Sequence, residues 1–198
     1  MSTIKLFTSY RNRDADMWRN SQQHYGHISI TLHWLVALLV FGMFGLGLWM
    51  VELDYYHGWY QRAPDLHKSI GITLFDIMVL RLFWRYSNPR PAPLASLASW
   101  EKRLSGWLHV FFYPLLFVLM LSGYLISTAD GRAIAVFDLF RVPATLTSIP
   151  DQEDIAGLVH QWLAYTLIGL VALHALAALK HHFLDRDGTL TRMLRGKP

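Results

Sequence analysis

Four stretches of apolar residues divide this chain, and each approaches the length needed to cross a lipid bilayer. They run from Ile30 to Val51, Leu66 to Trp84, Leu104 to Ser127 and Ile155 to Leu179. A membrane-spanning helix needs about 20 mostly apolar residues. The composition agrees, because only 16% of the residues are charged, whereas soluble domains have about 25%. The sequence therefore predicts an all-α integral membrane protein, a bundle of four transmembrane helices.

The segments outside these stretches define the expected domain organisation. Residues 1–29 carry mixed charge and no apolar run, which predicts an N-terminal segment rather than a signal peptide. Residues 30–180 form the membrane domain, and residues 181–198 form a basic tail.

Three connections join the apolar stretches. Glu52–Asp65 is short and polar, and the proline-rich loop Tyr86–Ser99 cannot be regular helix. The longest connection, Thr128–Asp154, contains an apolar part, residues 133–140. We expect that part to lie on the membrane surface or to cap the bundle.

The distribution of Lys and Arg predicts the orientation. Segments on the amino-terminal side of the bundle hold most of them (Lys5, Arg11, Arg13, Arg19, Arg85, Arg90, Lys102, Arg103, Lys180, Arg186, Arg192, Arg195 and Lys197). The opposite side holds Arg62, Lys68, Arg132 and Arg141, and its acidic residues outnumber them. By the positive-inside rule both termini are cytoplasmic. The net charge of +4 is therefore a topology signal, and we expect membrane lipid rather than nucleic acid as a partner.

Histidines recur within the apolar stretches, where a polar side chain is expensive unless it has a partner. His160 and His174 are fourteen residues apart on the last stretch, or about 21 Å along a helix and on nearly the same face. The depth of each histidine in the membrane follows from its place on its apolar stretch and from the orientation. His67 and His160 then lie toward the outer side, and His33, His109 and His174 lie toward the cytoplasmic side. The inner layer thus has three candidates for two positions, and spacing does not choose between them.

Two layers of paired histidines predict two haems, each with its iron between two imidazoles. Such ligation leaves no open position on the iron and favours electron transfer over oxygen binding. The chain has no cysteine, which excludes disulfides, iron–sulfur ligation and covalent c-type haem. Gly42, Gly45 and Gly47 in the first stretch either pack helices closely or make room for a flat ring.

Other polar residues have two or more interpretations. Arg81 lies at the inner histidine layer and either extends to the interface or pairs with a haem propionate. For Asp76 the interpretations are an ion pair with Arg81, a hydrogen bond to another helix, and proton transfer to a quinone. His181 and His182 form a basic interfacial cluster or line a quinone headgroup pocket.

Several short motifs occur in order along the chain and, taken together, resemble the bacterial cytochrome b561 family, which is related to the cytochrome b subunits of nickel hydrogenases and formate dehydrogenases. They are LHW (Leu32–Trp34), LHKSIG (Leu66–Gly71), VLRLFWR (Val79–Arg85), GYLISTADG (Gly123–Gly131), VPATL (Val142–Leu146), LVHQWLA (Leu158–Ala164), LHA at His174 and ALKHHFLDRDGTLTRM (Ala178–Met193).

The resemblance implies a four-helix protein with two haem b that exchanges electrons with ubiquinone in the bacterial inner membrane. Carried over by position, it places His33 and His174 on the cytoplasmic haem, and His67 and His160 on the periplasmic haem. His109 is then a non-ligand that contacts a propionate or the quinone.

Some members of this family oxidise superoxide at the periplasmic face, which implies cations near the outer haem. Lys68 and Arg62 are the candidates, although the outer loops are net negative and depart from that expectation. Two alternatives remain: a membrane anchor or relay for a periplasmic dehydrogenase or donor protein, and a histidine-based metal or proton transporter. The sequence leaves open whether the chain is a superoxide:ubiquinone oxidoreductase or an electron carrier.

Overall fold

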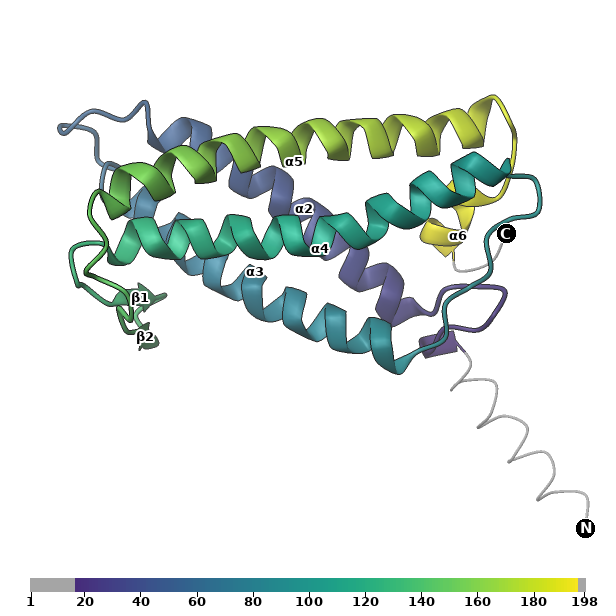
Figure 1. Ribbon diagram of the computed structural model, residues 1–198, viewed down its shortest axis with the longest axis horizontal. Helices are drawn as coiled ribbons and strands as arrows, with labels where there is room; N and C mark the ends of the chain where they lie inside the picture. The colour runs from purple at the N-terminus through teal and green to yellow at the C-terminus, as the bar shows by residue number, and fades with distance from the viewer. Residues whose placement is uncertain (1–16, 196–198) are drawn as a thin grey trace, which may run out of the picture. The chain divides into compact units, whose positions relative to one another are not determined.

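Except for Val51, the predicted apolar stretches all lie within long helices. These are α2 (His27–Met50), α3 (Arg62–Ser87), α4 (Ser99–Thr128) and α5 (Gln152–Phe183), followed by the short α6 (Thr189–Arg195). They are seen in a computed structural model that describes residues 17–195 (Figure 1). Residues 1–16 of the expected N-terminal segment and residues 196–198 of the expected tail lie outside the described residues.

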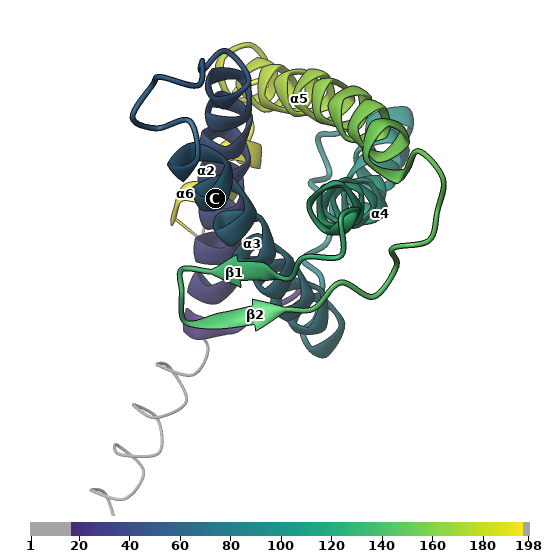
Figure 2. The same cartoon turned by 90° about the vertical axis from the view of Figure 1, so that its left-hand side faces the viewer.

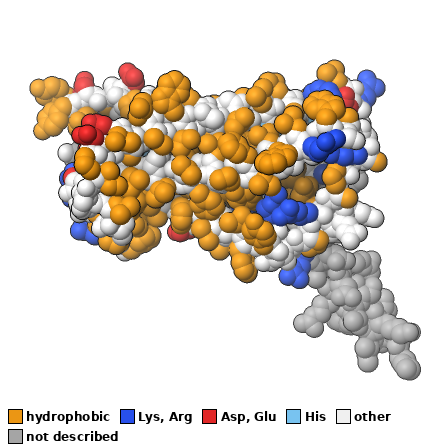
Figure 3. All heavy atoms as spheres, viewed as in Figure 1, with side chains coloured by type: hydrophobic (Ala, Val, Ile, Leu, Met, Phe, Trp, Pro, Cys, Tyr) orange, Lys and Arg blue, Asp and Glu red, His pale blue; other side chains and the backbone are white. Residues whose placement is uncertain are grey.

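Three helices of the described part, α2, α4 and α5, are long and apolar enough to cross a membrane. Few residues in their most apolar windows are buried, and Figure 3 shows many apolar side chains on the face in view. An extensive exposed apolar surface is typical of helices that contact lipid. α3 is less apolar because it carries Lys68, Asp76, Arg81 and Arg85. The fourth span of the expected bundle therefore stays a prediction.

Helix ends follow local chemistry. α3 begins at Arg62, inside the connection expected at 52–65, and Pro64 lies in its first turn. Proline is tolerated there because that N–H has no partner within the helix. At the start of α4, the Glu101 carboxylate accepts the N–H of Ala98 at 2.9 Å and caps the helix. The proline-rich loop is irregular over residues 88–98, as predicted, but Tyr86 and Ser87 belong to α3 and Ser99 begins α4.

The chain divides into two compact units. Unit 1 comprises the described residues of the segments Met1–Leu35, Val79–Gly106 and Leu173–Pro198, and unit 2 comprises Val36–Met78 and Trp107–Ala172. Unit 2 has an apolar core (Val36, Val40, Leu74, Met78, Leu115, Leu116 and Leu167). Burial of these side chains fixes how the helical segments of unit 2 pack against one another.

The expected connection at 128–154 contains a β-hairpin in unit 2. Strands β1 (Ile134–Val136) and β2 (Phe140–Val142) pair antiparallel, with Ile134 opposite Val142. Figure 2 shows the hairpin beside α3, where the Ser69 hydroxyl accepts the N–H of Phe137 at 3.1 Å. Ile134 and Val136 are buried. Of the apolar part at 133–140, which was expected on the membrane surface or as a cap, residues 134–136 therefore form a strand with two buried side chains, whereas Phe137, Leu139 and Phe140 are exposed.

Unit 1 is held together by polar contacts. Asn20 donates to the Pro89 carbonyl at 3.1 Å and accepts from the Gly26 N–H at 2.9 Å and the Ser29 hydroxyl at 2.7 Å. The buried Arg192 of α6 donates to the carbonyls of Ala92 and Gln23. These bonds join the N-terminal segment, the proline-rich loop and α6.

Candidate functional site

In unit 2, His67 from α3 and His160 from α5 face one another. Their ring centres are 6.2 Å apart and their planes are inclined by 70°. These are the two histidines that the sequence analysis paired because both lie toward the outer side of the membrane. Among the described residues, the buried Nδ1 of His67 has no hydrogen-bond partner. A buried polar atom without a partner is unusual in a folded protein and is typical of a position where a ligand or an ordered water binds.

One turn of α4 orients His160. The His160 Nδ1 donates to the Leu119 carbonyl at 3.0 Å and lies 3.1 Å from the Ser122 hydroxyl. A carbonyl oxygen can only accept, so Nδ1 carries the proton. The other ring nitrogen, Nε2, then has a lone pair that can bind a metal ion.

Two glycines make room for these rings. A Cβ at Gly47 would lie 3.3 Å from the Cε1 of His67, and a Cβ at Gly123 would lie 3.1 Å from the Cε1 of His160. Gly42 and Gly45 have open space where a Cβ would be. Of the three glycines in the first apolar stretch, Gly47 is therefore the one that fits the interpretation of space for a ring.

Both histidines line a cavity of about 700 Å³ in unit 2. Ligand pockets commonly measure roughly 300–1,000 Å³. Most of the lining is apolar, with Phe44, Leu116 and Leu167 among its residues. A large apolar cavity between helices, with two imidazoles facing into it, suits a flat apolar cofactor.

In unit 1, His33 from α2 and His174 from α5 form a second pair. Their ring centres are 6.4 Å apart and their planes are inclined by 68°. Arg81 from α3 belongs to the same site, because its Nη2 lies 3.1 Å from the His33 Nδ1. Arginine can only donate, so the His33 Nδ1 accepts this bond.

The spacing of both pairs fits a metal ion between the rings. An imidazole nitrogen binds a metal ion at roughly 2 Å and its ring centre lies roughly 1 Å further, so two opposed imidazoles have centres roughly 6 Å apart. A direct hydrogen bond between ring nitrogens would bring the centres to roughly 5 Å. The separations of 6.2 and 6.4 Å match the first arrangement.

A second cavity, of about 610 Å³, lies beside the hairpin in unit 2. Arg62, Lys68 and Arg132 line it together with Asp65 and Asp138. Lys68 and Arg132 also line the cavity that holds His67 and His160. Although the outer loops are net negative by sequence, the lining of this cavity carries more cations than carboxylates.

Some of this positive charge is paired. Lys68 bonds Asp65 at 2.7 Å, and the Arg132 guanidinium bonds Asp130. Bonds from the backbone N–H and then from the guanidinium of Arg132 hold the pKa of the Asp130 carboxyl below its ordinary value.

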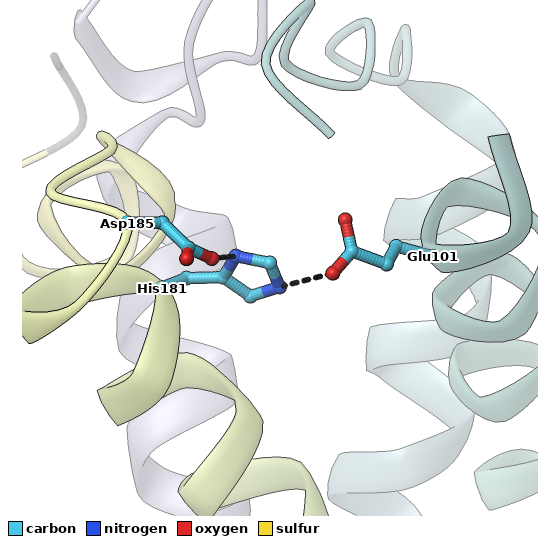
Figure 4. Close-up of side chains that lie close together, drawn as sticks. All are labelled: Glu101, His181 and Asp185. Atoms are coloured by element: carbon cyan, nitrogen blue, oxygen red, sulfur yellow. Dashed lines mark ion pairs between the residues drawn. The ribbon is translucent and has the colours of Figure 1, made fainter. Parts of the chain in front are cut away.

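The candidate quinone residues at the end of α5 lie among carboxylates. The His181 Nδ1 is 2.7 Å from Asp185, and its Nε2 is 4.0 Å from Glu101 (Figure 4). Lys180 pairs with both carboxylates, at 3.1 Å for Glu101 and 2.7 Å for Asp185. The Lys180 hydrogen bond lowers the pKa of Asp185. Glu101, His181 and Asp185 are close enough to share one cation, but the Lys180 ammonium already supplies a positive charge.

The other predicted residues are placed as follows. His109 lies on α4 in unit 2 and is half-buried. His182 contacts the ring of Phe183, with centres 4.8 Å apart. Asp76 is exposed on α3.

Sequence reasoning missed the groups that position His160, namely Ser122, Gly123 and the Leu119 carbonyl. The adjacent small residues Ser122 and Gly123 in a run of large apolar side chains were the available signal. A backbone carbonyl leaves no signal in the sequence.

The helices of this chain can cross a membrane, its histidine pairs are spaced for iron, and it has no cysteine that could attach a haem covalently. These features define a b-type membrane cytochrome, a haem-binding protein of electron transport. The family model of the prokaryotic cytochrome b561 matches residues 24–196, and the chain belongs to this family.

Three curated relatives are similar to this chain over nearly their whole length. Cytochrome b561 homolog 2 of Escherichia coli (strain K12) is 52% identical over 88% of this chain and 93% of its own length. Cytochrome b561 homolog 1 of the same organism is 24% identical over 86% and 96%. The probable superoxide oxidase CybB of Yersinia pestis is 29% identical over 87% and 97%.

Proposed function

We propose that this chain is a diheme cytochrome of the bacterial inner membrane that carries electrons between the periplasmic face and ubiquinone. The observation that carries the proposal is the spacing of two histidine pairs, each within one unit. His67 and His160 would ligate one haem, and His33 and His174 the other. Bound haem supplies reversible one-electron chemistry. α3 would be the fourth span, with both termini in the cytoplasm.

The electron donor in this proposal is superoxide. The Yersinia pestis relative is named a probable superoxide oxidase. Three cations, Arg62, Lys68 and Arg132, line the cavity beside the hairpin, and two of them also line the His67–His160 cavity. Clustered positive charge raises the encounter rate of a small anion. Two superoxide anions each lose one electron and become dioxygen, while one ubiquinone takes up two electrons and two protons.

Quinone reduction needs proton carriers and a headgroup site. Asp76 is a candidate carrier because its exposed carboxylate lies on a helix that would face lipid, where ubiquinone resides. His181 and His182 are headgroup candidates at the cytoplasmic end of α5, and His109 is a candidate contact for a propionate or the quinone.

The first experiment asks whether haem is present. A dithionite-reduced minus oxidised spectrum of the purified protein should show a b-type band, and a pyridine haemochrome assay should count two haems per chain. Absence of the band would contradict the whole proposal and favour a histidine-based transporter.

The second experiment asks what donates the electron. Superoxide added to the oxidised protein with ubiquinone should produce ubiquinol, at a rate that falls with ionic strength. Lys68→Gln and Arg62→Gln should slow this reaction several-fold. Arg141→Gln is the matched control, because Arg141 is exposed and lines neither cavity. A reaction that needs a separate protein donor would replace the superoxide assignment by the membrane relay.

A further inference from the structure

Trp34 follows the proposed iron ligand His33 on α2, and its ring contacts the ring of that histidine. The two ring centres are 5.3 Å apart and the planes are inclined by 75°, so the rings meet edge-on. An edge-on contact is one of the favoured geometries of aromatic rings. One side of the His33 imidazole is therefore bounded by the indole of Trp34.

The indole of Trp34 is itself held by α6. Its N–H donates to the Met193 carbonyl at 2.7 Å, although the two residues are 159 positions apart in the sequence. Met193 lies in the last turn of α6, where the backbone carbonyls have no partner within the helix and can accept from elsewhere. A C-terminal helix is thus joined to the residue beside a proposed ligand.

The residue before Met193 anchors α6 within unit 1. The buried Arg192 donates to the carbonyls of Ala92 and Gln23. Its guanidinium also lies 5.9 Å from the centre of the Tyr25 ring, within reach of a cation–π contact. These contacts hold the Met193 carbonyl in place as an acceptor.

We propose that Trp34 is a positioning residue through which α6 sets the ring orientation of His33, and so the ligand geometry of the unit 1 haem. The inference rests on the proposed function, since it takes His33 as an iron ligand. It adds a residue and a helix that act on this ligand.

Rotation about the Cβ–Cγ bond decides how an imidazole or an indole ring is oriented. This torsion is broad in both side chains, so the ring orientation depends on neighbouring groups. In unit 2 the Leu119 carbonyl accepts the N–H of the His160 ring and so fixes its rotation. In unit 1 the bond to Met193 fixes the indole, and the rigid indole limits the rotation of the His33 ring. Contacts that orient a ligating histidine also affect how it binds the metal.

The test compares Trp34→Phe with Trp84→Phe in the full-length, haem-loaded protein. Trp34→Phe keeps an aromatic ring but removes the N–H donor. Trp84→Phe is the matched control, because the Trp84 N–H donates to the Ser29 hydroxyl at 3.0 Å in the same unit. Haem is counted first, so that a wild-type protein with fewer than two haems overturns the proposed function separately.

Electron paramagnetic resonance of the oxidised protein measures the ligand geometry, because the g values of a ferric haem with two imidazole ligands depend on the angle between the ligand planes. Trp34→Phe should shift the highest g value of one haem and leave that of the other unchanged. The shifted signal should be the one that His174→Ala removes. An unchanged spectrum, or the same shift in Trp84→Phe, overturns the proposal.

The role of α6 is tested by combining Trp34→Phe with Arg192→Gln, which weakens the anchor of α6. Arg192→Gln should shift the same g value in the wild-type background and should add nothing in the Trp34→Phe background, where the bond to α6 is already absent. Shifts that add would mean that α6 does not act through Trp34, and they overturn the proposal.

A further measurement covers the case in which Trp34→Phe binds only one haem. Nitrogen NMR of the reduced protein identifies the Trp34 indole N–H as the signal that Trp34→Phe lacks. Arg192→Gln should speed its hydrogen exchange by roughly threefold or more, because the bond to Met193 is weakened. Arg195→Gln, an exposed change on the same helix, should not. An exchange rate that Arg192→Gln leaves unchanged overturns the proposal.

Discussion

The two histidine pairs have nearly the same ring spacing, 6.2 and 6.4 Å, but different surroundings. His67 and His160 line a large apolar cavity, and His160 donates to a neutral carbonyl. His33 accepts from the cation Arg81 in a unit joined by polar contacts. The comparison separates two properties. Ring spacing determines whether iron fits between the rings, whereas the groups that contact the Nδ1 atoms differ in charge.

The largest effect should come from removing one ligand of each pair. His67→Ala and His174→Ala should each reduce the haem content from two per chain to one, because an iron with one protein ligand is held weakly. The remaining haem should keep its own spectrum, as measured by haemochrome assay and electron paramagnetic resonance. Loss of both haems in either variant would mean that the two units do not bind haem independently.

The next effect concerns the space beside the rings of unit 2. Gly47→Ala and Gly123→Ala add a Cβ at 3.3 and 3.1 Å from His67 and His160, so each ring must shift by a few tenths of an ångström. We expect partial loss of the unit 2 haem and no change in unit 1. Gly45→Ala is the control, because it faces open space on the same helix. It should keep both haems and gain about 0.5–1 kcal/mol of stability from helix propensity.

Which histidines pair could be predicted in part from the sequence, because the length of the apolar stretches and the distribution of charge give the depth of each histidine in the membrane. The sequence paired His67 with His160 in this way, and the structure brings these two rings together. The inner pair needed the family resemblance, because His33, His109 and His174 share one depth. The structure brings His33 and His174 together and leaves His109 in the other unit.

Contacts between residues that are distant in the sequence could not be predicted. Arg81 and His33 are 48 residues apart, and no pattern in the sequence specifies which nitrogen faces the guanidinium. The hairpin at 134–142 was missed because its strands have three residues each, too short for a periodic signal. The Leu119 carbonyl is a backbone group, which any residue at that position would supply.

A smaller effect on stability should come from the polar contacts of unit 1, which unit 2 with its apolar core does not share. Arg192 is buried and donates to the carbonyls of Ala92 and Gln23. Arg192→Ala leaves these acceptors without a charged donor, and hydrogen bonds of this kind contribute about 1.5–3 kcal/mol. We expect a lower midpoint of thermal unfolding and easier loss of the unit 1 haem. Arg195→Ala, an exposed change on the same helix, should have little effect, and equal destabilisation by both variants would contradict a role for the buried contacts.

The smallest effect is a titration at the end of α5. Hydrogen bonding to Lys180 lowers the pKa of Asp185, so the ion pair is present above the ordinary pKa of Asp, about 3.9, and is lost only as pH falls through the lowered value. Lys180→Gln should move the pKa of Asp185 back toward its ordinary value, as followed by carbon NMR of the carboxyl. Asp130 in unit 2, whose pKa is lowered by Arg132, should not respond. A matching shift at Asp130 would show that the electrostatics of the two units are coupled, and the two sites would then have to be treated as one.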